Sequence, residues 1–502
     1  MNKAIYIATS EQNSGKSIIT LGLMSMLMGK MAKVGYFRPI IEDIEEGGFD
    51  NHIETVIGHF GMDIEFEDAY AITKSKLIKK KNKGKIGEVL DLIIEKYKKL
   101  EERFDFVLVE GTGFTGEGTV IELDMNVLIA KNLGIPTIIV GSGAGKTLEE
   151  LIDSLYLLYD SFKVKDVEVL AVIANKVQLQ NIELVTNSLK KSLPQNILVN
   201  SIPLIQNLNN PTVQEIVNEL DAKVLFGAAH LNNQTGSFSV GAMQLRNYLL
   251  HLKENSLVIT PGDRADIILG ALQANESLNY PTISGIVLTG NIVPEDSILK
   301  LIEGLSTIVP IIAVEEGTYF ITNKIGSIKS KIYANNKQKI KISIATFEKY
   351  VDLDNLAEKL ITFEAEGMTP KMFQYNLVKR AREHRKHIVL PEGNDERIIR
   401  AASRLLEMDV VAISVIGNKK QIESKVLELG LFFDFSKVQI INPIESEHFD
   451  DYVNTYYELR KAKNVTIEMA KDMMEDVSYF GTMMVYKGHA DGMVSGAAHT
   501  TQ

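Results

Sequence analysis

The sequence contains no cysteine among its 502 residues. This absence excludes disulfide bonds, thiolate zinc sites, iron–sulfur clusters and a cysteine nucleophile, and it fits a reducing cytoplasm. The sequence also lacks any uncharged apolar run of the roughly 18 residues that span a bilayer. The apolar part of the N-terminus, residues 4–8, is too short for a signal peptide. Together these absences predict a soluble, cytoplasmic protein without a membrane partner.

Positive charge is in deficit, because 54 Lys and Arg residues stand against 65 Asp and Glu, giving a net charge of −11 and a pI near 5.5. An acidic balance argues against nonspecific binding to nucleic acids or anionic membranes. The strongest local exception is a run of seven lysines between Lys74 and Lys85. Because no aromatic residues interleave this run, we expect a solvated surface loop there and no nucleic-acid partner.

The length predicts about three domains, and a composition of 45% hydrophobic and 24% charged residues is that of a folded protein. Short β-rich runs alternate with helical patterns, which predicts an α/β fold built from consecutive units with parallel sheets covered on both faces. The expected strands are residues 4–8, 107–109, 137–140, 169–173, 257–260, 286–289, 311–314, 388–390 and 410–416. The clearest helical patterns are 18–28, 86–100, 371–386 and 450–463.

The first candidate site is the segment ATSEQNSGKS, residues 8–17, between the first strand and a helix. Gly15 allows the backbone to approach a phosphate, Lys16 offers a charge to its oxygens, and Ser17 offers a hydroxyl to Mg²⁺. Glu110 ends a buried strand where an acid on the metal side is expected. The first glycine of the usual pattern is missing, so the residues leave open whether this loop binds a nucleotide or is a relict.

Residues 1–215 resemble the P-loop amidase and dethiobiotin-synthetase-like superfamily. The resemblance is carried by Gly15, Lys16 and Ser17, by Phe-Arg-Pro at 37–39 and by residues 107–113. It implies a doubly wound parallel sheet, and known members of the superfamily use ATP to activate carboxylates.

The middle of the chain, residues 216–325, contains the turn Pro-Gly-Asp-Arg-Ala-Asp at 261–266. Gly262 suits a tight turn and Asp263 suits a helix cap, so we expect a capped turn rather than a ligand site. With the Gly-Ala-Ala-His segment at 227–230, this region resembles the DRTGG domain, an α/β module with a regulatory or architectural role. Residues 326–370 are expected to form a helical connector.

The third region, residues 371–502, holds three segments of chemical interest. Residues 391–397 follow a strand and lead into a helix that carries Arg397. Arg460 lies in the last turn of the helix at 450–463, where a surface arginine is the default interpretation. Residues 490–501 run from a strand into a bend whose amides are expected to lie open to an anion. His384 and His387 share an expected helix but have no third ligand, so no metal site is predicted.

These segments resemble the phosphate acetyltransferase family, through Ile-Val-Leu-Pro-Glu-Gly at 388–393, Asp-Val-Ser-Tyr-Phe-Gly-Thr-Met at 476–483 and residues 490–501. The long form of that enzyme has the same three-part order, and its last domain is isocitrate-dehydrogenase-like. The resemblance implies the reaction acetyl-CoA + phosphate = acetyl phosphate + CoA, with coenzyme A as a substrate and no required cofactor. It further implies a homo-oligomer, and a nucleotide or NADH as an effector of the N-terminal domain.

The resemblance also assigns roles to residues. Arg460 anchors the phosphate or CoA, and the cleft wall consists of Ser495, Gly496, Thr500 and Thr501. The family's catalytic aspartate and serine are expected beyond Gln502. The chain is then either a fragment of a longer protein, which we favour, or a natural truncation, and we expect it to be inactive by itself. Two alternatives remain open at this point: an ATP-dependent ligase or amidase acting through Lys16, and a noncatalytic ligand-sensing scaffold. The acyl-chain specificity is open as well.

Overall fold

A computed structural model describes most of the chain, in the ranges 4–9, 11, 13–44, 48–113, 119–305, 309–328, 330–363 and 368–498, with only the backbone of 119–123. The chain divides into two compact units, Met1–Thr369 and Pro370–Gln502. Among the described residues, no helix combines the length and the apolar composition that crossing a bilayer requires.

The first unit is built on a six-stranded sheet in the order β2-β5-β1-β6-β7-β8, with every neighbouring pair parallel. Its strands are β1 (Ala4–Thr9), β2 (Val34–Phe37), β5 (Phe106–Glu110), β6 (Thr137–Ser142), β7 (Val169–Val177) and β8 (Leu198–Pro203). The four strands expected in this region are confirmed as β1, β5, β6 and β7. They are runs of Val, Ile and Ala that are almost entirely buried, as a parallel sheet covered on both faces requires.

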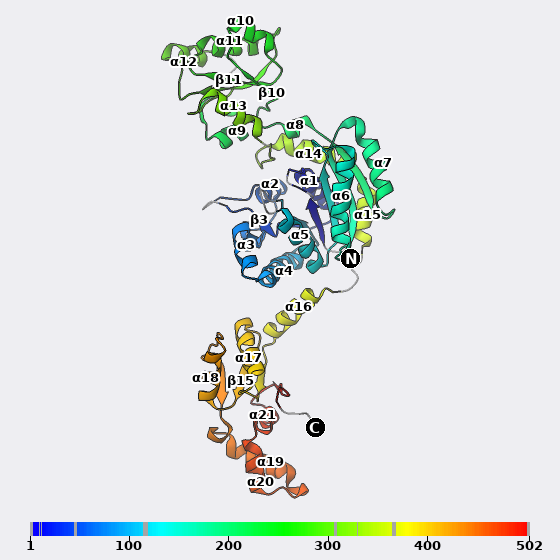
Figure 1. Ribbon diagram of the computed structural model, residues 1–502, viewed down its shortest axis with the longest axis vertical. Helices are drawn as coiled ribbons and strands as arrows, with labels where there is room; N and C mark the ends of the chain where they lie inside the picture. The colour runs from blue at the N-terminus through cyan, green and yellow to red at the C-terminus, as the bar shows by residue number, and fades with distance from the viewer. Residues whose placement is uncertain are drawn as a thin grey trace. The chain divides into compact units, whose positions relative to one another are not determined.

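Helices cover both faces of this sheet (Figure 1). The helices of this region are α1 (Lys16–Lys30), α2 (Asn51–Phe60), α3 (Lys74–Asn82), α4 (Ile86–Arg103), α5 (Thr119–Leu133), α6 (Leu148–Lys163), α7 (Ile182–Ser192) and α8 (Gln206–Asn209). The expectation of a loop at the lysine run was wrong, since most of the run forms α3. Leu77 is buried beneath α3, while its lysines are exposed or half-buried, so an apolar contact anchors a segment whose charges suggested a loop.

A five-stranded sheet follows in the order β10-β11-β12-β13-β9, in which only β9 is antiparallel. Its strands are β9 (Lys223–Phe226), β10 (Ser237–Val240), β11 (Ser256–Pro261), β12 (Ile283–Thr289) and β13 (Ile311–Ala313), and its helices are α9 (Val213–Leu220), α10 (Leu245–Tyr248), α11 (Ala265–Glu276), α12 (Asp296–Glu303) and α13 (Thr318–Ser327). The three strands expected here are confirmed as β11, β12 and β13.

The turn before α11 differs from its expected form. The N-cap of α11 is Arg264, without a side-chain cap, so the assignment of Asp263 as the cap was wrong. Arg264 instead pairs with Asp266, its Nε lying 2.8 Å from Oδ1. Gly262 is required by close packing, because a Cβ there would lie 1.7 Å from the carbonyl oxygen of Ile292.

After the second sheet the chain returns to the first. Helix α14 (Lys337–Tyr350) packs along α1 and β8, and α15 (Leu353–Thr362) lies against β7 (Figure 1). A Cβ at Gly22 of α1 would lie 2.1 Å from the ring of Phe347, so glycine permits the two helices to meet. The five-stranded sheet is therefore an insertion into the first domain, and the segment expected as a connector completes that domain.

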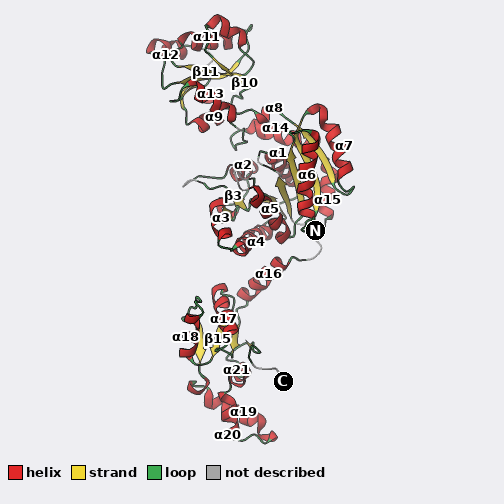
Figure 2. Cartoon of the chain, in the orientation of Figure 1, coloured by secondary structure: helices red, strands yellow, loops and turns green. Residues whose placement is uncertain are grey.

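The second unit is a parallel sheet in the order β16-β15-β14-β17, flanked by helices (Figure 2). Its strands are β14 (His387–Leu390), β15 (Ala412–Ile416), β16 (Val438–Ile441) and β17 (Gly492–Met493), and its helices are α16 (Pro370–Glu383), α17 (Glu396–Met408), α18 (Lys419–Glu428), α19 (Phe449–Arg460), α20 (Ile467–Glu475) and α21 (Val477–Tyr486). The expected strands and helices are confirmed. His387 lies in β14, so it does not share a helix with His384 as expected.

Candidate functional site

The phosphate loop is held from the end of a neighbouring strand. Gly15 is the N-cap of α1 and has the left-handed φ of 78° that favours glycine. Asn175, fully buried in β7, donates from Nδ2 to the carbonyl oxygen of Ser14 at 2.8 Å, and Lys176 donates from Nζ to the carbonyl oxygen of Asn13 at 2.7 Å. Two side chains of one strand therefore fix the loop. Their position after a buried run was the one feature of the sequence that could have indicated this role.

Lys16 lies folded into the protein. Its Nζ donates to the carbonyl oxygen of Gly111 at 2.8 Å and is 3.6 Å from Oε1 of Glu110. Only 8% of the residue is exposed. The lysine that the loop pattern assigned to a phosphate is thus already bound to the end of β5.

Glu110 is fully buried at the end of β5, as the sequence pattern predicted. Several groups stabilise its negative charge. Its Oε2 accepts hydrogen bonds from Thr20 Oγ1 at 2.7 Å and from Tyr36 OH at 2.9 Å. Burial alone raises the pKa of the carboxyl, yet the adjacent His52, Lys16 and Arg38 groups outweigh burial and hold that pKa well below its usual range. Burial lowers the pKa of His52 itself, and the charge of Glu110 opposes that shift.

A second buried acid beside Glu110 is held by an arginine. Arg38 donates from Nη1 to both carboxylate oxygens of Asp50, at 2.6 and 2.7 Å. Asp50 is also the N-cap of α2, accepting from the amides of His52 and Ile53. Sequence reasoning used Arg38 only as part of a resemblance. It missed Asp50 and His52, because only the fold brings their segment next to Glu110.

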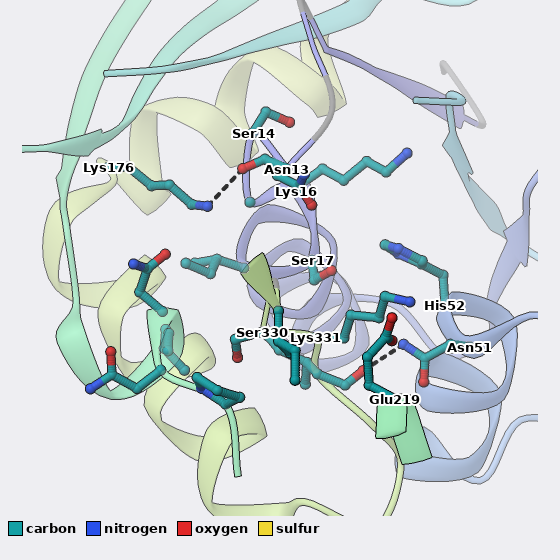
Figure 3. A pocket seen from close by; sticks show the side chains of 18 of the residues that line it. Asn13, Ser14, Lys16, Ser17, Asn51, His52, Lys176, Glu219, Ser330 and Lys331 are labelled. Carbon is teal, nitrogen blue, oxygen red and sulfur yellow. Dashed lines mark hydrogen bonds between the residues drawn. The ribbon is translucent and has the colours of Figure 1, made fainter. Parts of the chain in front are cut away.

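The loop opens onto a cavity of about 820 Å³. Lys16, Ser17, Arg38 and His52 line one part of it, and Lys176 approaches the loop from the side opposite His52 (Figure 3). Its far side includes residues 330–332, here called the strap, which connect the inserted sheet to α14.

The strap is bonded to α2 and to the inserted domain. Asn51 donates from Nδ2 to the carbonyl oxygen of Ile332 at 2.9 Å, the bond dashed in Figure 3, and Thr55 donates to the same oxygen at 3.1 Å. In the strap, the backbone amide of Lys331 donates to Oε2 of Glu215 in α9 at 3.3 Å. Lys339 of α14, which is completely buried, lies 2.5 Å from Oε1 of the same carboxylate. The strap therefore lines the cavity and is also hydrogen-bonded to α9, the first helix of the insertion.

P-loops commonly bind Mg²⁺ together with a nucleotide, and the residues here do not fit that ion. Both oxygens of Asp50 are taken by Arg38, and Oε1 of Glu110 lies within 4 Å of nitrogens of Lys16, His52 and Arg38. Mg²⁺ needs oxygen ligands at about 2.0–2.1 Å in near-octahedral geometry, and neighbouring cations repel it. Within the described ranges, no group of three or more His, Asp or Glu side chains is arranged to hold a metal.

In the second unit, the bend after β17 is organised around Glu392. This buried carboxylate accepts hydrogen bonds from the backbone amides of Gly496, Ala497 and Ala498, at 3.0, 2.7 and 2.8 Å. The expectation that these amides lie open to an anionic ligand was therefore wrong. An acid of the chain occupies them, and the sequence signalled Glu392 only as part of a resemblance.

Arg397 joins the same bend from α17. Its guanidinium pairs with Asp395, the N-cap of that helix, and donates to the carbonyl oxygen of Ala497. The hydrogen bonds from Arg397 lower the pKa of the Asp395 carboxyl to about 2. Arg397 thus holds the bend in a fixed place over the start of α17.

The remaining residues assigned to the acyltransferase site are separated in the chain. Arg460 is exposed in the last turn of α19 and, within the described ranges, takes part in no ion pair. Ser495 and Gly496 are exposed in the bend, where Gly496 has a φ of 111°. Thr500 and Thr501 lie outside the described residues. Among the described residues, no hydrogen bond or ion pair joins Arg460 to the bend.

Comparisons with known proteins identify three regions. Residues 3–226 match the family model described as an AAA domain, residues 215–328 match the DRTGG domain, and residues 372–502 match phosphate acetyl/butaryl transferase. The order agrees with the three consecutive α/β regions expected from the sequence. The last of these models defines the class of the chain as an acyltransferase enzyme.

Relatives extend the match over the whole chain. Phosphate acetyltransferase of Nitratidesulfovibrio vulgaris is 40% identical over 506 residues, covering 100% of this chain and 72% of its own length, and that of Synechocystis is 39% identical over 513 residues with the same coverage. The chain belongs to the phosphate acetyltransferase family. A crystal structure of a phosphotransacetylase from Streptococcus pyogenes is 40% identical over 27% of this chain and 40% of its own, with a TM-score of 0.25.

Proposed function

We propose that this protein carries out reversible acetyl transfer between coenzyme A and inorganic phosphate, and that residues 372–502 supply part of the substrate site. The observation that carries the proposal is the 40% identity to a phosphate acetyltransferase along the entire chain. The reaction requires a thiolate nucleophile, cations that hold phosphate groups, and donors that stabilise an oxyanion. The absence of cysteine is compatible with it, because direct attack by the CoA thiolate needs no enzyme nucleophile.

The roles of the side chains are part of this proposal. Arg460 binds a phosphate of CoA or of acetyl phosphate, which suits an exposed guanidinium without an ion pair in the described part of the chain. Ser495, Gly496, Thr500 and Thr501 are proposed to bind substrate as part of the cleft wall. Glu392 keeps the wall in shape by occupying its amides, and therefore acts as a positioning residue.

CoA binding to the 502-residue chain tests this assignment. Arg460→Ala is expected to weaken the affinity for CoA, measured by isothermal titration calorimetry, by about 10- to 100-fold, since a charge-assisted hydrogen bond contributes about 1.5–3 kcal/mol. Lys463→Ala is the matched control, because Lys463 is an exposed cation three residues further along. Equal affinities of the two variants would remove Arg460 from the site. Formation of acetyl-CoA from acetyl phosphate and CoA measures turnover in the same preparations.

We also propose that the phosphate-loop domain binds a nucleotide as an effector and that the protein is a cytoplasmic homo-oligomer. The 820 Å³ cavity at the loop is of the size that holds small-molecule ligands, and the strap connects it to the inserted domain. Lys331→Ala, which removes an exposed cation from the cavity lining, is expected to weaken binding of ATP or NADH while leaving CoA binding unchanged. Loss of both would contradict separate sites.

A further inference from the structure

We propose that the phosphate loop binds the phosphates of a nucleotide without a divalent cation, because this chain holds both nearby carboxylates with its own cations. The inference rests on the proposed nucleotide effector and adds the form in which it binds. It departs from the magnesium role that the loop pattern assigned to Ser17 and Glu110.

The first support is that the chain's own groups surround both acids, although Oε1 of Glu110 has no hydrogen-bond partner among the described residues. Arg38 Nη1 lies 2.6 and 2.7 Å from the two oxygens of Asp50, and Asp50 Oδ1 also accepts two helix amides. Glu110 Oε2 accepts from Thr20 and Tyr36. The remaining oxygen, Oε1, lies 3.0 Å from His52 Nδ1, 3.6 Å from Lys16 Nζ and 3.8 Å from Arg38 Nε. A divalent cation at Oε1 would face these nitrogens at short range.

The second support is a buried donor that lines the cavity without a hydrogen-bond partner. Arg38 is 5% exposed, and within the described ranges its Nε has no hydrogen bond, although it is a charged donor. Buried polar atoms are nearly always bonded, so such an atom marks a position that a ligand oxygen satisfies. The helix N-terminus at Gly15 adds backbone amides and a favourable dipole for an anion.

The charges around the cavity also favour a bound polyanion. Several acids of the lining are already bonded to the chain, through the pairs Glu11 with Lys146, Glu42 with Lys74, and Asp50 with Arg38. Lys331 of the strap adds a cation to the lining. The cavity therefore suits a polyanion that brings its own charge and leaves the internal pairs intact. Without a divalent ion to bridge the β- and γ-phosphates, the bound nucleotide is not hydrolysed.

Calorimetric titration of the full 502-residue chain with ATP, once with excess EDTA and once with MgCl₂, tests the inference. We expect the two dissociation constants to agree within about threefold and no release of inorganic phosphate. Affinity that rises about tenfold or more with Mg²⁺, or steady phosphate release, would overturn the inference and leave the effector proposal standing. Absence of binding under both conditions would contradict the effector proposal itself.

A variant that releases Asp50 sharpens the test. Arg38→Gln frees the Asp50 carboxylate and removes the Nε donor, so ATP binding is expected to weaken in EDTA and to become dependent on Mg²⁺ by about tenfold or more. Arg246→Gln, at an exposed arginine of α10, is the matched control and should bind as the parent chain does. Circular dichroism spectra and unfolding transitions establish that both variants are folded. A folded Arg38→Gln that binds ATP equally with EDTA and Mg²⁺ would show that Arg38 does not set the metal preference.

Discussion

The carboxylate of Glu392, just after β14, accepts a 2.7 Å hydrogen bond from the backbone amide of Ala497, in the bend after β17. This bond joins segments that lie 105 residues apart in the chain but at the carboxyl ends of neighbouring parallel strands. Ligands of open α/β sheets bind at this edge. The relationship explains how a bend rich in small residues keeps one conformation.

Glu392→Gln is expected to destabilise the second unit by about 1–3 kcal/mol, because an amide cannot accept all three backbone hydrogen bonds with both of its polar atoms. Urea unfolding measures the loss, and faster hydrogen exchange in peptides covering 496–498 localises it. The control is Glu396→Gln, which changes an exposed glutamate paired with Arg400 four residues away. Unchanged exchange at 496–498 in Glu392→Gln would contradict the positioning role.

Lys339→Met is expected to destabilise the first unit by about 3–5 kcal/mol, because it leaves the buried Glu215 without its cation. The double variant Lys339→Met with Glu215→Leu should recover most of this loss, since an apolar pair of similar volume replaces the buried ion pair. The free energy of unfolding in urea gives both values. A double variant as unstable as the single one would indicate that packing, and not the pair, dominates at this position.

The low pKa of Glu110 predicts a loss of stability in acid. The folded pKa lies below the value of about 4.3 found in unfolded chains. The contribution is therefore complete above that pH and is lost as pH falls through the folded pKa. Melting temperatures between pH 6 and 3 should fall less steeply for Glu110→Gln than for the parent chain. Glu219→Gln, at an exposed glutamate, should follow the parent, and parallel curves for all three would contradict the prediction.

The strap should loosen when its bonds to α2 are removed. Asn51→Ala combined with Thr55→Val deletes both donors to the carbonyl oxygen of Ile332, at a cost of about 1 kcal/mol for each bond. Limited proteolysis should then cut near residues 330–332 faster than in the parent. Thr186→Val, which removes a hydroxyl of α7 bonded to Ser201, serves as control. Equal cleavage in both variants would show that the strap does not depend on α2.

The regular elements could be predicted from the sequence because each depends on a local pattern. The continuous apolar run predicts the buried strand β1, and apolar residues that recur every three to four positions predict the helix α4. The lysine run failed this test because α3 holds only two apolar residues among its charges, and only Leu77 of the two is buried. The return of α14 to α1 could not be predicted either, since the matching of Gly22 with Phe347 spans more than 300 residues.

In the candidate sites, too, local motifs could be predicted and partners distant in the chain could not. Gly15, Lys16 and Ser17 were recognised as a loop before a helix, which the structure contains. The partners that set the behaviour of the loop, Arg38 with Asp50, come from segments that only the folded sheet brings next to Glu110. Glu392 was not assigned a function because its hydrogen-bond donors are backbone amides, which every residue except proline has and which no sequence pattern identifies.

The most direct test of the acyltransferase assignment is hydrogen–deuterium exchange of the 502-residue chain with and without coenzyme A. We predict slower exchange in peptides that cover the last turn of α19 with Arg460 and the bend at 492–498, and unchanged exchange at residues 9–17. Slower exchange confined to residues 9–17, or none in the second unit at saturating coenzyme A, would contradict the assignment.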